Sequence, residues 1–152
     1  MAQQSVHVFL DVSVLVAASR SPTGGSAMAL QVCQRQPYRA FVTELILLEA
    51  RVNIAQKFTA KELARFYAQL AAASPEIGGP PSQELLARCA HIVAEKDAHV
   101  LAAAWACNAG YLLTLDRRHL LTTAVLAAGL PFMVATPGEL LGAVVSKKGP
   151  WT

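Results

Sequence analysis

Short apolar segments alternate with longer segments of helical periodicity along most of the chain. This alternation predicts parallel strands, because each connecting helix carries the chain back to the edge at which the next strand begins. We therefore expect an α/β fold of three layers, α/β/α, around a central and mainly parallel sheet. The strands that we expect cover residues 6–10, 38–42, 111–115 and 131–135.

Several helix ends are marked by residues that favour such positions. Thr59 and Glu62 have the spacing of a capping box at a helix start. Gly129 is the residue type that ends a helix, and Pro137 is favoured in a first turn. The helices that we expect cover residues 25–34, 43–58, 59–73, 83–93, 98–108, 117–128 and a last one from 137, with a loop at 74–82.

The composition favours one domain with a large core. The chain has 152 residues, of which 54% are hydrophobic and 15% are charged. We expect a single domain over residues 1–145, followed by a short C-terminal tail at 146–152. So high an apolar content also favours a buried interface between two copies, and a homodimer is expected. The net charge of +3 permits a polyanionic partner without requiring one.

The sequence also indicates a soluble protein of the cytoplasm. The three cysteines form no CxxC pair and leave an odd number, which argues against a zinc site and against a disulfide framework. The start of the chain lacks the basic and then apolar layout of a signal peptide. Residues 98–115 are apolar enough to suggest a membrane span, but His99, Asn108 and Gly110 interrupt them. No membrane association is expected.

Aspartates follow two of the predicted strands. Asp11 and Asp116 stand directly after the first and third of these strands, and Asp97 precedes the helix expected from residue 98. In a parallel sheet, ligands bind outside the carboxyl ends of the strands. Aspartate is also a favoured N-cap of helices. Each aspartate alone is therefore either a cap or a ligand, and for Asp97 the two interpretations are about equally good.

One glutamate is not explained by capping. Glu49 lies well inside the helix expected over 43–58, beside Leu45, Leu48 and Val52, which we interpret as the stripe facing the core. Glu49 is then either a partly exposed flank residue or a group that faces a site. Four carboxylates that converge would repel one another, and a hard divalent cation, which binds oxygen ligands, would relieve that repulsion. Such a metal site can activate water against a phosphodiester.

Four motifs carry a resemblance to a known family. They are FLDVSVLVAAS, TELILLE, KDAHVLAAA and GYLLTLD, in this order along the chain. Together they resemble the PIN domain, the fold of many toxin–antitoxin ribonucleases of the VapC type and of other metal-dependent nucleases. The resemblance extends from about residue 5 to 145.

The resemblance implies a site and an activity. The acidic residues that would be catalytic and would bind the metal are Asp11, Glu49, Asp97 and Asp116. Ser13 and Thr114 would be the small hydroxyl residues that line the site. The family implies Mg²⁺ or Mn²⁺, hydrolysis of RNA phosphodiester bonds, frequent homodimers and, for many members, an inhibitory antitoxin protein.

Basic residues near these motifs are candidates for RNA contact. Arg117 and Arg118 follow Asp116, with His119 next, at positions where relatives sometimes carry further acids or asparagines. These residues either contact RNA phosphates or form the exposed first turn of a helix. Arg20 is a further candidate for electrostatic guidance of the RNA backbone.

Two other functions fit parts of the pattern. A phosphatase of the haloacid-dehalogenase type also begins with an aspartate after a strand, but it needs a second aspartate two residues later, where this chain has Ser13. A catalytically degenerate PIN-like module that binds RNA or a protein would be marked by loss of an acid. All four acids are present, so the sequence favours a metal-dependent endoribonuclease.

Overall fold

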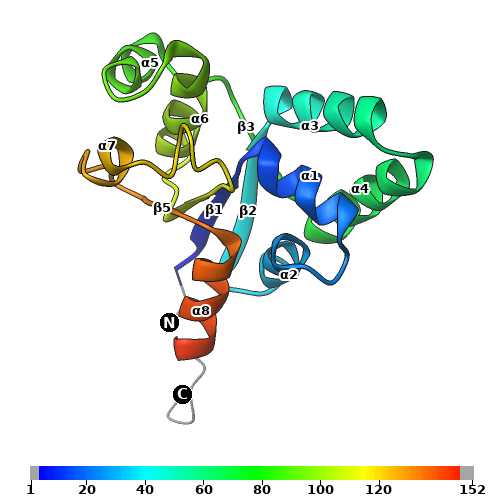
Figure 1. Ribbon diagram of the computed structural model, residues 1–152. Coiled ribbons are helices and arrows are strands. Elements are labelled where there is room, and N and C mark those ends of the chain that lie inside the picture. Colours follow the sequence, from blue (N-terminus) through cyan, green and yellow to red (C-terminus); the bar gives the residue numbers. More distant parts are fainter. Residues whose placement is uncertain (1–3, 148–152) are drawn as a thin grey trace.

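A single parallel sheet organises the molecule (Figure 1). The computed structural model describes residues 4–147. Within them, five strands lie in the order β3-β2-β1-β4-β5, and all neighbouring pairs are parallel. The strands are β1 (Val6–Leu10), β2 (Tyr38–Thr43), β3 (Glu76–Gly78), β4 (Tyr111–Leu113) and β5 (Met133–Ala135).

Helices cover both faces of this sheet (Figure 1). Helices α1 to α4 lie on one face, where α8 packs against α2, and α5, α6 and α7 lie on the other. The helices are α1 (Val12–Arg20), α2 (Gly25–Val32), α3 (Glu44–Lys57), α4 (Ala60–Ala73), α5 (Gln83–Ala90), α6 (Glu95–Ala106), α7 (Thr123–Leu126) and α8 (Pro137–Lys147). The predicted α/β fold of three layers with a central parallel sheet is therefore confirmed.

The second half of the central strand β1 is deeply buried. Val8, Phe9 and Leu10 are at most 1% exposed, because helices cover both sides of the strand. Leu10 lies in register with Leu113 of β4, so β1 and β4 end at the same level of the sheet. Whatever follows these two strands is thereby brought together.

Local signals in the sequence correctly placed several helix ends. Thr59 and Glu62 form the predicted capping box at the start of α4. The Thr136 hydroxyl accepts a hydrogen bond from the backbone nitrogen of Glu139 and so caps α8. Gly129 adopts a positive φ of 70°, as expected for a residue that ends a helical turn.

Three elements differ from the prediction. Helix α1 was not predicted, because its valine-rich sequence is as typical of a strand as of a helix. Strand β3 lies in the predicted loop 74–82, where it pairs only with β2 at the edge of the sheet. The helix predicted over 117–128 is reduced to a turn followed by the short α7.

The buried face of α3 also differs from the prediction. The predicted stripe of Leu45, Leu48 and Val52 is exposed, at 47%, 51% and 40%. The face that packs into the core carries Ile46, Ala50 and Ile54 instead. The prediction was wrong because α3 has apolar residues on most of its circumference, so that periodicity alone does not choose a face.

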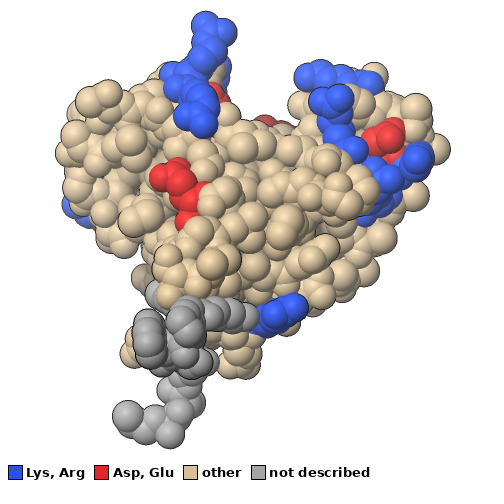
Figure 2. Space-filling model, turned by 60° about the horizontal axis from the view of Figure 1, so that its bottom comes forward, with Lys and Arg blue, Asp and Glu red and all other residues tan. Residues whose placement is uncertain are grey.

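Few charges interrupt the surface that Figure 2 shows, in keeping with the low charged content of the chain. None of the helices in residues 4–147 is long and apolar enough to cross a membrane. Of the predicted tail 146–152, the first two residues belong to α8, and residues 148–152 lie outside the described part of the chain.

Candidate metal centre

The order of the strands determines where in the fold the candidate site lies. Strands β2 and β3 lie on one side of β1, in that order, and β4 and β5, which come later in the chain, lie on the other side of β1. The helices that follow β1 and β4 therefore lie on opposite faces (Figure 1), and a crevice forms between the ends of the two strands, as in other open α/β sheets. The backbone nitrogen of Asp11 donates to the carbonyl oxygen of Leu113 at 3.0 Å. The two strand ends are thus adjacent.

An open pocket of about 470 Å³ lies at these strand ends. Side chains from α1, α3, α6 and the turn after β4 line it. Among them are all four acids of the predicted quartet, Asp11, Glu49, Asp97 and Asp116. The structure therefore brings together four residues that are far apart in the sequence.

Asp11 is held by two hydroxyl groups from different parts of the chain. Its side chain is buried, and Oδ2 accepts hydrogen bonds from Ser13 Oγ and from Thr114 Oγ1, each at 2.8 Å. Asp11 occupies the N-cap position of α1, but its side chain makes no capping hydrogen bond. The capping interpretation is therefore wrong for this carboxylate. Its cost of burial is offset by the two hydroxyls.

The backbone after β4 fixes the direction of both hydroxyl groups. Ser13 Oγ accepts a hydrogen bond from the backbone nitrogen of Leu115, and Thr114 Oγ1 accepts one from that of Asp116, both at 3.0 Å. A hydroxyl group has a single proton to donate. Each hydroxyl oxygen uses a lone pair to accept the hydrogen bond from a backbone nitrogen, and it donates its proton to Asp11. Ser13 and Thr114, predicted to line the site, therefore orient its most buried acid.

Asp116 both caps a turn and faces the pocket. Its Oδ1 accepts hydrogen bonds from the backbone nitrogens of Arg118 and His119, at 3.1 Å and 3.0 Å. Its Oδ2 lies 3.1 Å from Nδ1 of His119. Asp116 is thus a cap, as an aspartate at a helix start is expected to be, and it still presents one oxygen to the neighbouring side chains.

Asp97 lies in the first turn of α6 rather than at its cap. The helix begins at Glu95 with Ala94 as its N-cap, so the interpretation of Asp97 as the cap is wrong. Its Oδ2 is buried and has no hydrogen-bond partner in the structure. A buried carboxylate oxygen without a partner is costly. The position near the helix N-terminus offsets part of that cost, and a cation in the pocket would offset the rest.

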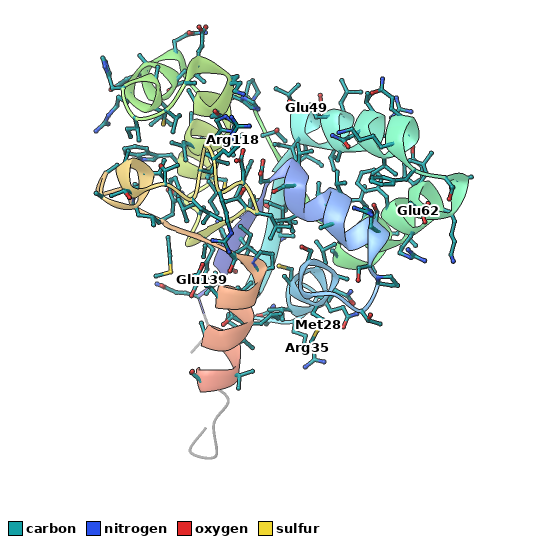
Figure 3. The ribbon with its side chains drawn as sticks, viewed as in Figure 1. Met28, Arg35, Glu49, Glu62, Arg118 and Glu139 are labelled. Carbon is teal, nitrogen blue, oxygen red and sulfur yellow. The ribbon has the colours of Figure 1, made fainter. Side chains whose placement is uncertain are left out.

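Glu49 enters the pocket from the opposite side, on α3. Its Oε1 lies 3.7 Å from Nε2 of His99, and its side chain is 44% exposed. In Figure 3, Glu49 and Arg118 lie toward the same end of the molecule, near the end of β1. Glu49 is therefore an exposed flank residue of its helix that also lines the pocket, and its role as a ligand stays a prediction.

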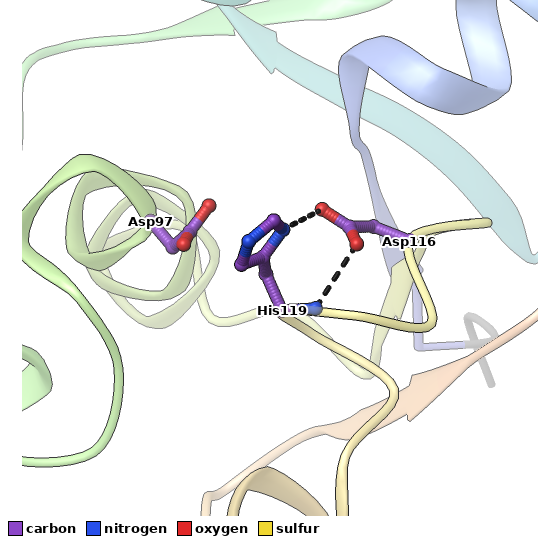
Figure 4. Close-up of side chains that lie close together, drawn as sticks. All are labelled: Asp97, Asp116 and His119. Atoms are coloured by element: carbon purple, nitrogen blue, oxygen red, sulfur yellow. Dashed lines mark hydrogen bonds and ion pairs between the residues drawn. The ribbon is translucent and has the colours of Figure 1, made fainter.

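A histidine that the sequence did not mark as a ligand joins two of the acids (Figure 4). Single ligand atoms of Asp97, Asp116 and His119 all lie within 4.8 Å of one another. Carboxylate oxygens and an imidazole nitrogen are suitable donors for a divalent ion, and Asp97, which has a buried oxygen without a partner, belongs to the group. The residues present therefore fit a divalent metal. The spacing of Asp116 and His119, three residues apart on one turn, is the signal that could have identified the histidine.

Basic residues near the site include two that were not predicted. Lys57 and Lys96 line the pocket, although no motif in the sequence singled them out. Arg117 and Arg118 are exposed on the turn after Asp116. Arg20 ends α1 at the helix terminus remote from Asp11, with its guanidinium 4.6 Å from the centre of the Phe58 ring.

The three cysteines are not part of this pocket. Burial raises the pKa of Cys33 to about 12 and that of Cys107 to about 11. Both groups are therefore protonated thiols near neutral pH, and thiols are weak nucleophiles and weak metal ligands. The chemistry of the site rests on oxygen and imidazole groups.

Known proteins resemble the chain in sequence pattern and in fold. A family model described as a PIN domain matches residues 7–118, a range that includes all four acids and ends one residue before His119. No curated protein sequence matches the chain.

Three solved structures share the fold. One is VapBC2 from Rickettsia felis, bound to a DNA fragment from its promoter. It has a TM-score of 0.63 at 12% sequence identity, and the match covers 85% of this chain and 97% of that one. PAE2754 from Pyrobaculum aerophilum has a TM-score of 0.60 at 18% identity, covering 94% and 99%. VapBC-5 from Mycobacterium tuberculosis, of the VapBC family of toxin–antitoxin systems, has a TM-score of 0.55 at 20% identity, covering 86% and 98%.

Proposed function

The chain belongs to the PIN-domain family, and on this premise we propose that it is a divalent-metal-dependent endoribonuclease that hydrolyses RNA phosphodiester bonds. The observation that carries the proposal is the convergence of four acids on one pocket, with a buried oxygen of Asp97 that has no partner. Such an arrangement is costly without a cation. In a hydrolase that acts through a bound metal, each of these carboxylates would serve to bind the ion.

The acids divide into two roles in this proposal. Asp11, Asp97 and Asp116 hold the ion, Mg²⁺ or Mn²⁺, and Glu49 joins them directly or through water. Bound there, such an ion supplies an activated water and offsets the charge that develops on the scissile phosphate. Ser13 and Thr114 keep Asp11 in one orientation, as outer groups around metal sites commonly do for the ligands.

Lysines at the mouth of the pocket favour a polyanionic substrate. Lys57 and Lys96 line the same pocket as the acids. Their positive charges would attract an RNA backbone and place a phosphate beside the carboxylates, which by themselves repel it. Arg117 and Arg118, exposed on the adjacent turn, extend this positive region.

The biological role that we propose is supported by solved structures of similar fold. Two of them are VapBC complexes, described as bound to promoter DNA or as members of toxin–antitoxin systems. We infer that this chain is the toxin of such a pair and has an antitoxin protein as partner. The exposed Leu45, Leu48 and Val52 on α3 support the predicted homodimer, since large apolar side chains in one region of a surface favour a protein interface. A cytoplasmic location stays a prediction.

Cleavage of RNA by matched variants tests the activity. Wild type, Asp11→Asn and Asp97→Asn are incubated with a mixed structured RNA in Mn²⁺, in Mg²⁺ and in EDTA. We expect cleavage by wild type with metal only, and a loss of more than about 100-fold in either variant, since even groups that only orient a ligand cost about 10- to 100-fold. Glu84→Gln, an exposed acid of α5, is the control that should cleave normally.

Thermal unfolding of the same proteins tests the metal directly. Adding Mn²⁺ to chelator-treated wild type should raise the melting temperature, because ligand binding to the folded state stabilises it by mass action. Asp11→Asn and Asp97→Asn should show a smaller rise. Folded wild type that neither cleaves RNA nor responds to metal would instead indicate a catalytically degenerate binding module.

A further inference from the structure

His119 lies between two carboxylates of the candidate metal centre (Figure 4). Its ring is drawn between Asp97, on α6, and Asp116, on the turn after β4. Asp116 holds the histidine twice, through its backbone nitrogen at 3.0 Å and through Nδ1 at 3.1 Å. The imidazole is therefore fixed in place by the same carboxylate that caps the turn.

A pairing with Asp116 alone does not account for this arrangement. The hydrogen bonds between His119 and Asp116 lie within the turn, and they do not explain why Asp97 lies close to His119. Yet the ligand atoms of all three residues lie within 4.8 Å of one another, and Oδ2 of Asp97 is buried without a hydrogen-bond partner. Asp97, which carries the unpartnered oxygen, and the imidazole belong to one group.

The dimensions of this group suit a single ion. Oxygen and nitrogen ligands lie about 2.0–2.2 Å from small divalent ions, so two ligands on opposite sides of one ion are roughly 4.2 Å apart. Atoms already within 4.8 Å of one another reach such positions through small rotations of their side chains. A carboxylate on each of two elements and an imidazole on the turn would then surround the ion from three directions.

We propose that His119 supplies an imidazole nitrogen to the metal ion beside Asp97 and Asp116, and thereby makes the site selective for a first-row transition ion such as Mn²⁺ or Co²⁺ over Mg²⁺. The inference rests on the proposed function, which it deepens by choosing between the two ions. Mg²⁺ prefers oxygen ligands, whereas imidazole favours transition ions, whose affinity rises from Mn²⁺ toward Co²⁺. An all-carboxylate site would have a weaker preference.

His99 is the competing nitrogen donor and must be separated by experiment. It also lines the pocket, and its Nε2 is buried without a hydrogen-bond partner, 3.7 Å from Glu49. It does not belong to the group of atoms within 4.8 Å. A nitrogen signal from a bound metal has to be assigned to one histidine or the other.

Pulsed electron paramagnetic resonance of bound Mn²⁺ makes that assignment without measuring activity. The proteins compared are wild type, His119→Ala, His99→Ala and His91→Ala, the last an exposed histidine at the end of α5 that serves as control. We expect coupling to an imidazole nitrogen in wild type, in His99→Ala and in His91→Ala, and its loss in His119→Ala alone. Circular dichroism without metal establishes that each variant is folded.

Titration calorimetry with Mn²⁺ and Mg²⁺ measures the selectivity. The preference of wild type for Mn²⁺ should fall by about 10-fold or more in His119→Ala, in the range by which groups around metal sites change affinity. His119→Asp replaces the nitrogen with oxygen, so it should bind Mg²⁺ at least as well as wild type while losing the nitrogen coupling. This variant separates loss of the imidazole from loss of a ligand.

The possible results separate this inference from the proposed function. Mn²⁺ binding without nitrogen coupling, or coupling lost in His99→Ala instead, would overturn the role of His119 and leave a metal-dependent nuclease in place. Absence of Mn²⁺ and Co²⁺ binding to folded wild type at millimolar concentrations would overturn both. An unchanged ratio of Mn²⁺ to Mg²⁺ affinity in His119→Ala would also reject the inference.

Discussion

Asp11 and Asp116 both follow strands that lie side by side in the sheet, but different parts of the chain hold them. The carboxylate of Asp11 is oriented by Ser13 and by Thr114, the second of which is 103 residues away. Asp116 is held by the backbone nitrogens of Arg118 and His119, two and three residues further on. The first arrangement depends on the tertiary fold, because it exists only when β1 and β4 pair. The second depends on a local turn.

The difference has a chemical consequence for the site. The hydrogen bonds to Asp11 both reach Oδ2, and residues 4–147 provide no hydrogen bond to its Oδ1. Asp116 divides its two oxygens between the turn and His119. Asp11 is therefore fixed through Oδ2 and retains Oδ1 for a ligand, whereas Asp116 is fixed through Oδ1 and shares Oδ2 with His119. Two different solutions give the same result, a carboxylate that is oriented before the metal binds.

Thr114→Val should have the largest effect on folding, because it removes the tertiary support of Asp11. The Thr114 hydroxyl is fully buried, donates to Asp11 and accepts from the backbone nitrogen of Asp116. Valine has nearly the same shape but leaves both groups without that partner. The free energy of unfolding should fall by about 1–3 kcal/mol, and Mn²⁺ affinity by roughly 10-fold or more. Urea unfolding and calorimetry measure the two quantities.

A threonine without these contacts provides the control for that prediction. Thr23 lies exposed in the loop before α2, so Thr23→Val should change neither stability nor metal affinity. If Thr114→Val also left both quantities unchanged, Asp11 would not need its distant partner, and the contrast between the two aspartates would fail.

The same contrast explains what could be predicted from the sequence. The apolar runs before Asp11 and Asp116 predicted β1 and β4, and the rule for parallel sheets predicted that their ends meet. The capping role of Asp116 is local and was one of the two interpretations of the sequence, but the helix predicted over 117–128 is a turn followed by the short α7. By contrast, no local pattern could indicate that His119 meets Asp97, since that contact requires α6 to dock beside the end of β4.

Helix α3 shows the limit of periodicity in another way. Two faces of this helix are apolar. One carries Leu45, Leu48 and Val52, and the other carries Ile46, Ala50 and Ile54. The second face is buried because α3 packs against α1 and α4, where a residue as small as Ala50 permits close approach. The register of Glu49 toward the pocket follows from this packing. Hydrophobicity alone favoured the larger leucines and gave the wrong face.

Replacing Asp116 separates its local role from its role in the site. Asp116→Asn keeps an oxygen that can cap the turn, whereas Asp116→Ala removes it. We expect Asp116→Ala to lower the free energy of unfolding by about 1 kcal/mol, and Asp116→Asn by much less, because asparagine and aspartate cap equally well. Both variants should lose the rise in melting temperature with Mn²⁺, since neither has the carboxylate.

Equal stabilities of Asp116→Asn and Asp116→Ala in urea would count against a capping role. The hydrogen bonds to Arg118 and His119 would then contribute nothing measurable. A normal response of Asp116→Asn to Mn²⁺ would remove Asp116 from the metal site while leaving its role in the turn intact. The two readouts therefore test the two roles independently.

Ser13→Ala should have a smaller effect than Thr114→Val, although Ser13 makes the same kind of bond to Asp11 as Thr114 does. Ser13 is only partly buried, so water can replace its hydroxyl toward Asp11 and toward the backbone nitrogen of Leu115. We expect a loss of about 0.5–1 kcal/mol in unfolding free energy, at the low end for one hydrogen bond. Combined with Thr114→Val, the loss should differ from the sum of the single losses, because both hydroxyls bind one oxygen. Additive losses would mean that each hydroxyl acts through its backbone contact and not through Asp11.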